Sequence, residues 1–174
     1  MLDRRRHVRV PLNSKVVVVD NDIPKVNMIR DISISGAFIE TVDLPKVGSE
    51  IYLFFPLHHM EKTAQTAARV VRRIEPVDEV EFVIPGIGVE FVNIPFESSV
   101  LIEDYVIQVK YVYEELMLVI SMKEPDMKRL GQLLKKVKVG QYKDFFELKD
   151  KIRKTCYALG ILKEGGEEDG TRNS

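Results

Sequence analysis

From residue 15 to about residue 92 the chain alternates short apolar runs with turn residues. The runs are rich in β-branched and aromatic residues, as expected for strands, and residues that favour turns separate them, such as Asp20-Asn21-Asp22. The pattern predicts six strands, over residues 15–20, 24–31, 36–41, 50–55, 63–74 and 81–92. Because no helical pattern separates them, six strands in succession favour an antiparallel sheet closed as a barrel over a βαβ fold.

After Pro95 the spacing of the apolar residues becomes that of a helix. Large apolar residues recur at alternating steps of four and three positions, which keeps them on one helix face. They are Ile102, Val106, Val109, Tyr113, Leu116 and Ile120. This stripe predicts a helix of roughly seven turns over 96–122, longer than most globular helices. Shorter stripes predict two more helices over 126–138 and 142–159, the last ended by Gly160.

These elements divide the chain into four segments. We expect a flexible basic arm at 1–13, a β-barrel at 14–95, a helical extension at 96–163 and a disordered, glycine-rich tail at 164–174. The predicted fold class is therefore mainly β plus α. It is a six-stranded antiparallel β-barrel followed by a long helix and two further helices.

The composition is that of a soluble globular protein and excludes several kinds of site. Of the 174 residues, 45% are hydrophobic and 30% are charged, which argues against disorder and fibrous repeats. The single cysteine, Cys156, excludes an internal disulfide and a cysteine-cluster zinc site. No apolar run approaches the length of a bilayer span, and the arginine-rich start is unlike a secretory signal. We therefore expect a cytoplasmic protein without membrane insertion.

The net charge of −1 conceals three blocks of uneven charge. Residues 1–13 hold four arginines and one aspartate, a sum of +3. Residues 75–104 hold eight acidic residues and no lysine or arginine, a sum of −8. Residues 123–163 hold 12 basic and 5 acidic residues, a sum of +7. The chain thus has a basic arm, an acidic middle and a basic tail.

Two short polar motifs lie at the edges of the predicted barrel. Arg5 and Arg9 form an R-x-x-x-R pattern in the arm, and guanidinium groups suit phosphate and the O6/N7 edge of guanine. Asp31, Ser33 and Gly36 form a D-x-S-x-x-G pattern between the second and third strands. Residues two apart in a strand share a face, where a carboxylate can accept from guanine N1–H and N2–H. The glycine allows a close backbone approach or a positive φ. Together the motifs predict a site for an anionic purine nucleotide.

The two motifs, in this order and spacing, resemble those of the PilZ domain, the bacterial receptor module for cyclic di-GMP. Residues 68–71 and 86–91 look like later strands of that family, so the resemblance covers roughly residues 3–120. It implies a cyclic di-GMP-binding effector or adaptor that changes conformation on binding and signals through contacts with a protein partner. It implies no catalysis and no cofactor.

The resemblance also implies ligand-binding roles for Arg4, Arg5, Arg9, Asp31, Ser33 and Gly36. The two motif arginines would hold phosphate and the Hoogsteen edge of guanine. The aspartate and the serine would hold a guanine edge, and the glycine would shape the turn. In the family, an arginine directly before the first motif arginine favours two nucleotides per site, and Arg4 occupies that position.

Other functions are weaker alternatives. The chain could be a PilZ-like structural adaptor that binds a protein partner without nucleotide. A role in binding nucleic acid is disfavoured because the acidic middle would repel a phosphate backbone. His7, His58 and His59 lack acidic or cysteine partners at ligand spacing, so no metal site is predicted. The long helix either packs within the chain or mediates a homo-oligomer through residues around 102–120, and the downstream pathway is not indicated.

Overall fold

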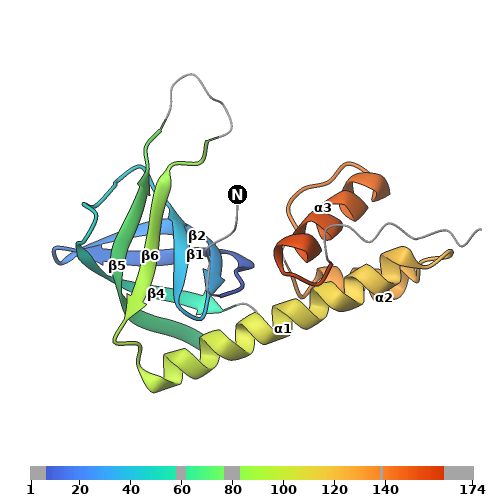
Figure 1. Cartoon of the computed structure of the whole chain (residues 1–174), viewed down its shortest axis with the longest axis horizontal. Coiled ribbons are helices and arrows are strands. Elements are labelled where there is room, and N and C mark those ends of the chain that lie inside the picture. The colour runs from blue at the N-terminus through green and yellow to red at the C-terminus, as the bar shows by residue number, and fades with distance from the viewer. Residues whose placement is uncertain (1–6, 58–61, 77–82, 138, 163–174) are drawn as a thin grey trace, which may run out of the picture.

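The computed structural model describes residues 7–57, 62–76, 83–137 and 139–162. Within these residues, six strands form a closed antiparallel barrel and three helices follow (Figure 1). The strands are β1 (Val10–Asp20), β2 (Ile23–Ser33), β3 (Gly36–Glu40), β4 (Glu50–Leu57), β5 (Lys62–Ile74) and β6 (Gly86–Val92). The helices are α1 (Phe96–Ser121), α2 (Met127–Leu134) and α3 (Phe145–Ala158). Neighbouring strands run in the order β1-β2-β3-β6-β5-β4, and β4 pairs with β1. The predicted fold class is confirmed.

The first strand begins earlier than the sequence pattern predicts. β1 starts at Val10 rather than at residue 15, so residues 10–13, which we assigned to the basic arm, belong to the barrel. Val10 and Leu12 are buried. The pairing of β1 with β2 is irregular between Pro11 and Ser14, as at a β-bulge. Buried positions alternate without a break from Val10 to Val18, but Ser14 occupies one of them, and Pro11 and Asn13 are residue types that strands disfavour. The sequence pattern therefore hides the start of β1.

The barrel interior is filled by alternate residues of its strands. In β4, Ile51, Leu53, Phe55 and Leu57 are buried and the residues between them are exposed, the pattern of a strand with one face on a core. β3 and β6 are instead buried over four consecutive residues each. The structure begins β6 at Gly86, whereas the predicted strand starts at residue 81, and residues 77–82 lie outside the described residues.

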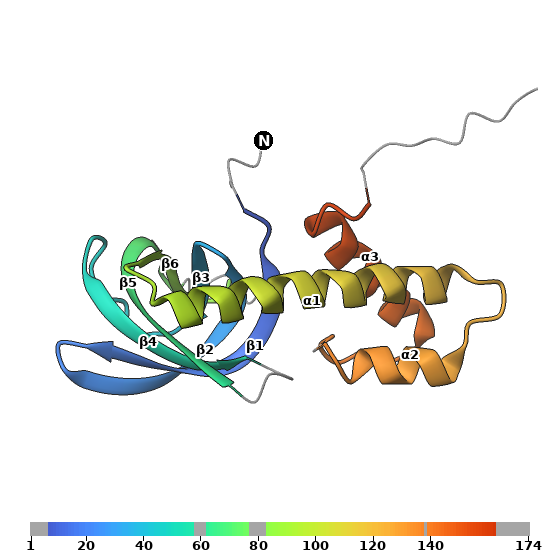
Figure 2. The same ribbon diagram turned by 90° about the horizontal axis from the view of Figure 1, so that it is seen from below.

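The long helix α1 joins the barrel to the other two helices. Its first half lies along the barrel, and α2 and α3 lie against its second half (Figures 1 and 2). Next to the barrel, the backbone N–H of Gln65 donates to Ser98 Oγ at 3.1 Å. Farther along, the Cys156 thiol of α3 donates to the Tyr113 carbonyl at 3.5 Å. The buried hydrophobic residues form one connected core from the barrel to α3.

Side-chain caps place the starts of the two short helices. The Asp126 carboxylate accepts from the backbone N–H of Arg129 at 2.9 Å, and that of Asp144 accepts from Glu147 at 2.8 Å. The predicted start of the third helix, at residue 142, is therefore too early. The second helix ends at Leu134 instead of 138. Gly160, with φ of 68°, follows α3 as predicted. Residue 138 and the tail at 164–174 lie outside the described residues.

Burial disfavours ionisation of three titratable groups in this core. Loss of solvation raises the pKa of Tyr113 to about 12 and that of Cys156 to about 11, and it also raises the pKa of Tyr105. A thiol with a raised pKa is a packing residue rather than a nucleophile. Among the described helices, none has the length and apolar character needed to cross a membrane.

Two leucines of α1 provide a test of how the helix is anchored. Leu116 is fully buried, whereas 67% of Leu118 is exposed. Leu116→Ala should lower the free energy of unfolding by about 2–5 kcal/mol because it leaves a cavity in the core. Leu118→Ala, the matched control, should change it by less than about 0.5 kcal/mol. Urea unfolding followed by circular dichroism measures both, and equal losses would contradict the assignment of the buried face.

Candidate functional site

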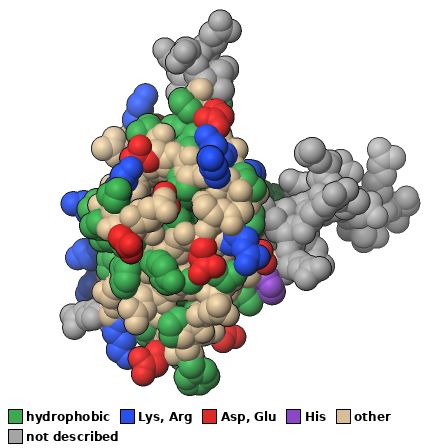
Figure 3. Space-filling view, turned by 90° about the vertical axis from the view of Figure 1, so that its left-hand side faces the viewer, with side chains coloured by type: hydrophobic (Ala, Val, Ile, Leu, Met, Phe, Trp, Pro, Cys, Tyr) green, Lys and Arg blue, Asp and Glu red, His purple; other side chains and the backbone are tan. Residues whose placement is uncertain are grey.

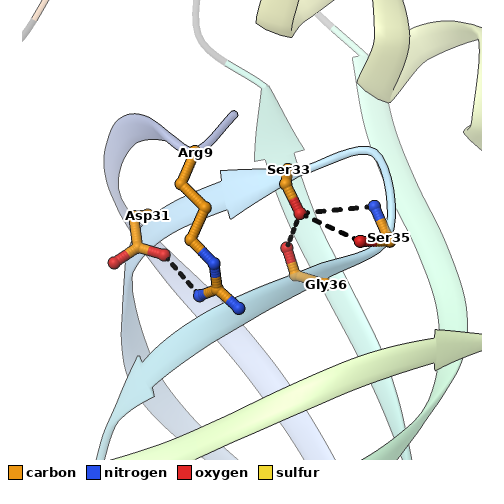
Figure 4. Close-up of polar contacts among 5 residues, drawn as sticks. All are labelled: Arg9, Asp31, Ser33, Ser35 and Gly36. Atoms are coloured by element: carbon orange, nitrogen blue, oxygen red, sulfur yellow. Dashed lines mark hydrogen bonds and ion pairs between the residues drawn. The ribbon is translucent and has the colours of Figure 1, made fainter. Parts of the chain in front are cut away.

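The start of β1 and the end of β2 bring two motif side chains into contact. Pro11 lies opposite Asp31 in the β1–β2 pairing, which places Arg9 beside that aspartate. The Nη1 of Arg9 donates to Oδ1 of Asp31 at 2.7 Å, and the two side chains point toward one another (Figure 4). The side chains are 25% and 36% exposed. The structure therefore unites a cation and an anion, from the two motifs, on an accessible surface.

The serine of the second motif is committed to the turn between β2 and β3. Ser33 is only 2% exposed, and its hydroxyl donates to the Gly36 carbonyl at 3.2 Å. The same oxygen accepts from the backbone N–H of Ser35 at 3.3 Å (Figure 4). A side chain with these contacts orders the turn, a role that the motif pattern did not predict.

The glycine of the second motif is required by a close backbone approach. A Cβ on Gly36 would lie 2.2 Å from the carbonyl oxygen of Val89 in β6. The backbone N–H of Phe91, also in β6, donates to the Ser35 carbonyl at 2.9 Å. Gly36 is not among the residues with positive φ. Of the two roles that the sequence allowed, the structure selects close packing, which fixes the turn against β6.

Arg9 and Asp31 neutralise each other's charge in an ion pair that can be broken. Exposed ion pairs contribute only about 0–1 kcal/mol, because water solvates the separated charges well. Arg9 and Asp31 can therefore give up this ion pair and bind a ligand instead, at little cost in free energy. A ligand that suits both needs an anionic or acceptor-rich edge for the guanidinium and N–H donors for the carboxylate.

Several predicted residues lie elsewhere or outside the described residues. Arg4 and Arg5 fall in 1–6, and His58 and His59 fall in 58–61, so the structure does not describe them. His7 is exposed. Within the part of the chain that the structure describes, no group of three or more His, Cys, Asp or Glu side chains could hold a metal ion.

One contact at this end of the barrel was missed by sequence reasoning. The hydroxyl of Tyr105 in α1 donates to the backbone carbonyl of Pro11 at 3.1 Å. Pro11 follows Arg9 by two residues and lies opposite Asp31, so the helix is bonded to the strand that carries half of the site. The sequence shows Tyr105 only as part of an apolar helix face, and nothing in that pattern identifies a partner 94 residues away.

Comparisons with known proteins bear on the family and the fold of the chain. A family model described as PilZ domain matches residues 3–108. Among solved structures, the inhibitor of motility MotI/DgrA from Bacillus subtilis aligns with 18% identity and a TM-score of 0.51, over 62% of this chain and 51% of that one. YcgR from Escherichia coli aligns with 13% identity and a TM-score of 0.53, over 66% of this chain and 49% of that one.

A third structure has the same fold. MrkH from K. pneumonia aligns with 18% identity and a TM-score of 0.50, over 66% of this chain and 55% of that one. The chain thus spans about half the length of each of these three proteins. At these identities the likeness establishes the fold. No curated protein matches the sequence.

The close approach at Gly36 can be tested by adding one methyl group. Gly36→Ala should lower the free energy of unfolding by about 1–3 kcal/mol, because the new Cβ forces β3 away from the Val89 carbonyl. Gly131→Ala is the control, since a Cβ at this helical glycine meets nothing within 4 Å. It should raise stability by up to about 1 kcal/mol. Chemical unfolding measures both, and an unchanged Gly36→Ala protein would contradict the packing.

Proposed function

The chain belongs to the PilZ domain family, and from this premise we propose that it is a receptor for cyclic di-GMP. The observation that supports the proposal is the contact between Arg9 and Asp31, one residue from each motif, on an accessible surface. YcgR from Escherichia coli and MrkH from K. pneumonia, which share the fold, were both solved in complex with cyclic di-GMP.

The chemistry of the pair matches the two functional edges of a guanine nucleotide. The guanidinium of Arg9 can donate two parallel hydrogen bonds to a phosphate or to guanine O6 and N7. The carboxylate of Asp31 can accept from guanine N1–H and N2–H. A carboxylate alone would repel the phosphates, so the arginine beside it is needed to make the surface acceptable to an anion.

The remaining motif residues complete the proposed site. Arg5 would add a second guanidinium from the arm. Ser33 and Gly36 would act by holding the β2–β3 turn in place, since one is buried in the turn and the other packs on β6. Arg4 precedes the first motif arginine, and we propose that it favours two nucleotides per site.

Binding would act as a conformational switch without covalent chemistry. An arm with a charge of +3 loses conformational entropy when it closes over the nucleotide, and contacts with the ligand offset that loss. Movement at the start of β1 reaches α1 through the hydrogen bond from Tyr105 to Pro11. The signal would then pass to a protein partner through the surface of the helical extension.

Substitutions in the pair test nucleotide binding directly. Arg9→Ala, Asp31→Ala and Arg5→Ala should each weaken cyclic di-GMP binding by at least about tenfold, because each removes a charged hydrogen-bonding group. Arg30→Ala is the matched control, since Arg30 lies in β2 beside Asp31 but is paired with Glu40. Isothermal titration calorimetry gives affinity and stoichiometry, with two nucleotides per protein expected for the unmodified chain.

Competing ligands and functions are separated in the same assay. Cyclic di-AMP, GTP and a short DNA duplex should bind at least about tenfold more weakly than cyclic di-GMP. Adenine lacks the N1–H and N2–H donors, and GTP and the duplex lack the shape of the cyclic dinucleotide. Unchanged affinity for cyclic di-GMP in both Arg5→Ala and Arg9→Ala would contradict the assignment of the site. A folded protein that binds none of the nucleotides would favour the alternative, a PilZ-like adaptor that recognises a protein alone.

The link between the site and α1 can be cut by removing one oxygen atom. Tyr105→Phe should leave cyclic di-GMP affinity within about threefold of the original, because the hydroxyl is bonded to Pro11 and not to a motif side chain. Binding of cyclic di-GMP should slow amide hydrogen exchange in α1. The Tyr105→Phe substitution should make this slowing smaller. Tyr111→Phe is the control, because Tyr111 lies on the same helix and is 64% exposed. Equal slowing in α1 for both variants would show that the signal takes another route.

A further inference from the structure

The face of α1 directed away from the core carries a second line of large apolar side chains. We call this line the outer stripe. It consists of Phe96, Val100, Ile107, Tyr111, Leu118 and, at the C-cap, Met122, with exposed fractions of 82%, 40%, 47%, 64%, 67% and 51%. At about 100° per residue these positions fall within an arc of about 80°. Single exposed apolar residues are ordinary, whereas a continuous line marks an interaction surface.

The outer stripe follows an 11-residue repeat. Phe96, Ile107 and Leu118 are eleven residues apart, and so are Val100, Tyr111 and Met122. Eleven residues make slightly more than three helical turns, so such a repeat stays close to one face of a helix that is straight or forms a gentle right-handed supercoil. Each repeat therefore presents an apolar pair in the same direction over the whole length of α1.

Acidic residues occupy the intervals between the apolar pairs. Glu103 and Asp104 follow the first pair, and Glu114 and Glu115 stand at the same positions of the next repeat. Glu115 is bonded to Arg129 of α2 at 2.6 Å. No described side chain forms an ion pair with Glu103 or Asp104, and both are exposed. The outer stripe is thus apolar with negative charge between its apolar pairs.

This charge pattern argues against a second copy of the chain as the occupant. In an antiparallel pair of α1 helices centred on Val109, apolar residues would face each other, with Ile107 opposite Tyr111. The same arrangement sets Asp104 opposite Glu114, so like charges would meet on both sides of the symmetry axis. An anionic membrane surface would be repelled for the same reason.

We propose that the outer stripe binds an amphipathic helix of another protein, with apolar residues in the same spacing and lysine or arginine opposite the acidic pairs. Charge complementarity selects this occupant, because basic residues would neutralise Glu103 and Asp104, with which no described side chain forms an ion pair. On the barrel end shown in Figure 3, by contrast, apolar, basic and acidic side chains are interspersed. The inference rests on the proposed adaptor role, for which it names the partner class.

Two synthetic peptides test the proposal on the full chain. Each has about 22 residues with leucines in the spacing of the outer stripe. One carries lysine pairs in the intervals and the other carries glutamate pairs. The lysine peptide should bind at least about tenfold more tightly in fluorescence anisotropy, and its affinity should fall as salt is raised. Titrations with and without cyclic di-GMP keep this result separate from nucleotide binding, so either proposal can fail alone.

Variants of the chain locate the binding surface. Ile107→Gln and Leu118→Gln should each weaken the lysine peptide by at least about fivefold, because each removes an apolar contact without adding charge. Replacing Glu103 and Asp104 together by lysine should abolish the preference between the peptides, because one interval becomes basic while the other stays acidic. Val26→Gln in β2 is the control, since its side chain is 68% exposed and lies on the barrel. Thermal unfolding of each variant confirms that it is folded.

The outcomes against the proposal are distinct. Equal affinity for the two peptides, no binding of either, or full affinity in Ile107→Gln and Leu118→Gln would overturn it. A dimer in light scattering that dissociates on Ile107→Gln would assign the outer stripe to a second copy instead.

Discussion

Continuous burial of one face of α1 is the constraint on which both halves of the molecule depend. The helices α2 and α3 have 8 and 14 residues, and helices this short are stable only when an apolar face is packed. Their partner is the second half of α1, whose first half is held by the barrel. Since one connected core runs from the barrel to α3, the helical extension is an integral part of the fold.

The 11-residue periodicity of the buried positions explains how one face of α1 packs first on the barrel and then on α2 and α3. Ser98, Val109 and Ile120 are buried at 11-residue intervals, and so are Tyr105 and Leu116. The sequence pattern, read as a heptad stripe widened by Tyr105, Val112 and Val119, predicted the helix almost to its ends. The structure buries Tyr105 and packs Val106, only partly buried, against the same core. Both periods share steps of four and three, so the sequence alone cannot choose between them. The choice depends on what packs against the helix, which is tertiary information.

For the site, the sequence indicated the chemistry of the residues but not their geometry. Residue types and spacing were enough to predict a cation and a carboxylate for one ligand, and the structure brings Arg9 and Asp31 together from positions 22 residues apart. The pattern could not show that these two groups pair with each other, nor that the hydroxyl of Ser33 is buried in the turn. It left two roles open for Gly36, because the decisive neighbour, Val89, lies 53 residues later in the chain.

The two faces of α1 also relate the two ends of the proposed signalling path. Tyr105 lies on the buried face, bonded to the strand that leads from Arg9, and the outer stripe lies on the nearly opposite face. A helix transmits displacement as a rigid body, because its backbone hydrogen bonds resist local stretching. In the proposed signalling path, a shift at Tyr105 would therefore move the outer stripe and the contacts of α2 and α3 together. The near-zero net charge hides the uneven distribution of charge along the chain, since the basic arm and the basic tail offset the acidic middle in the sum.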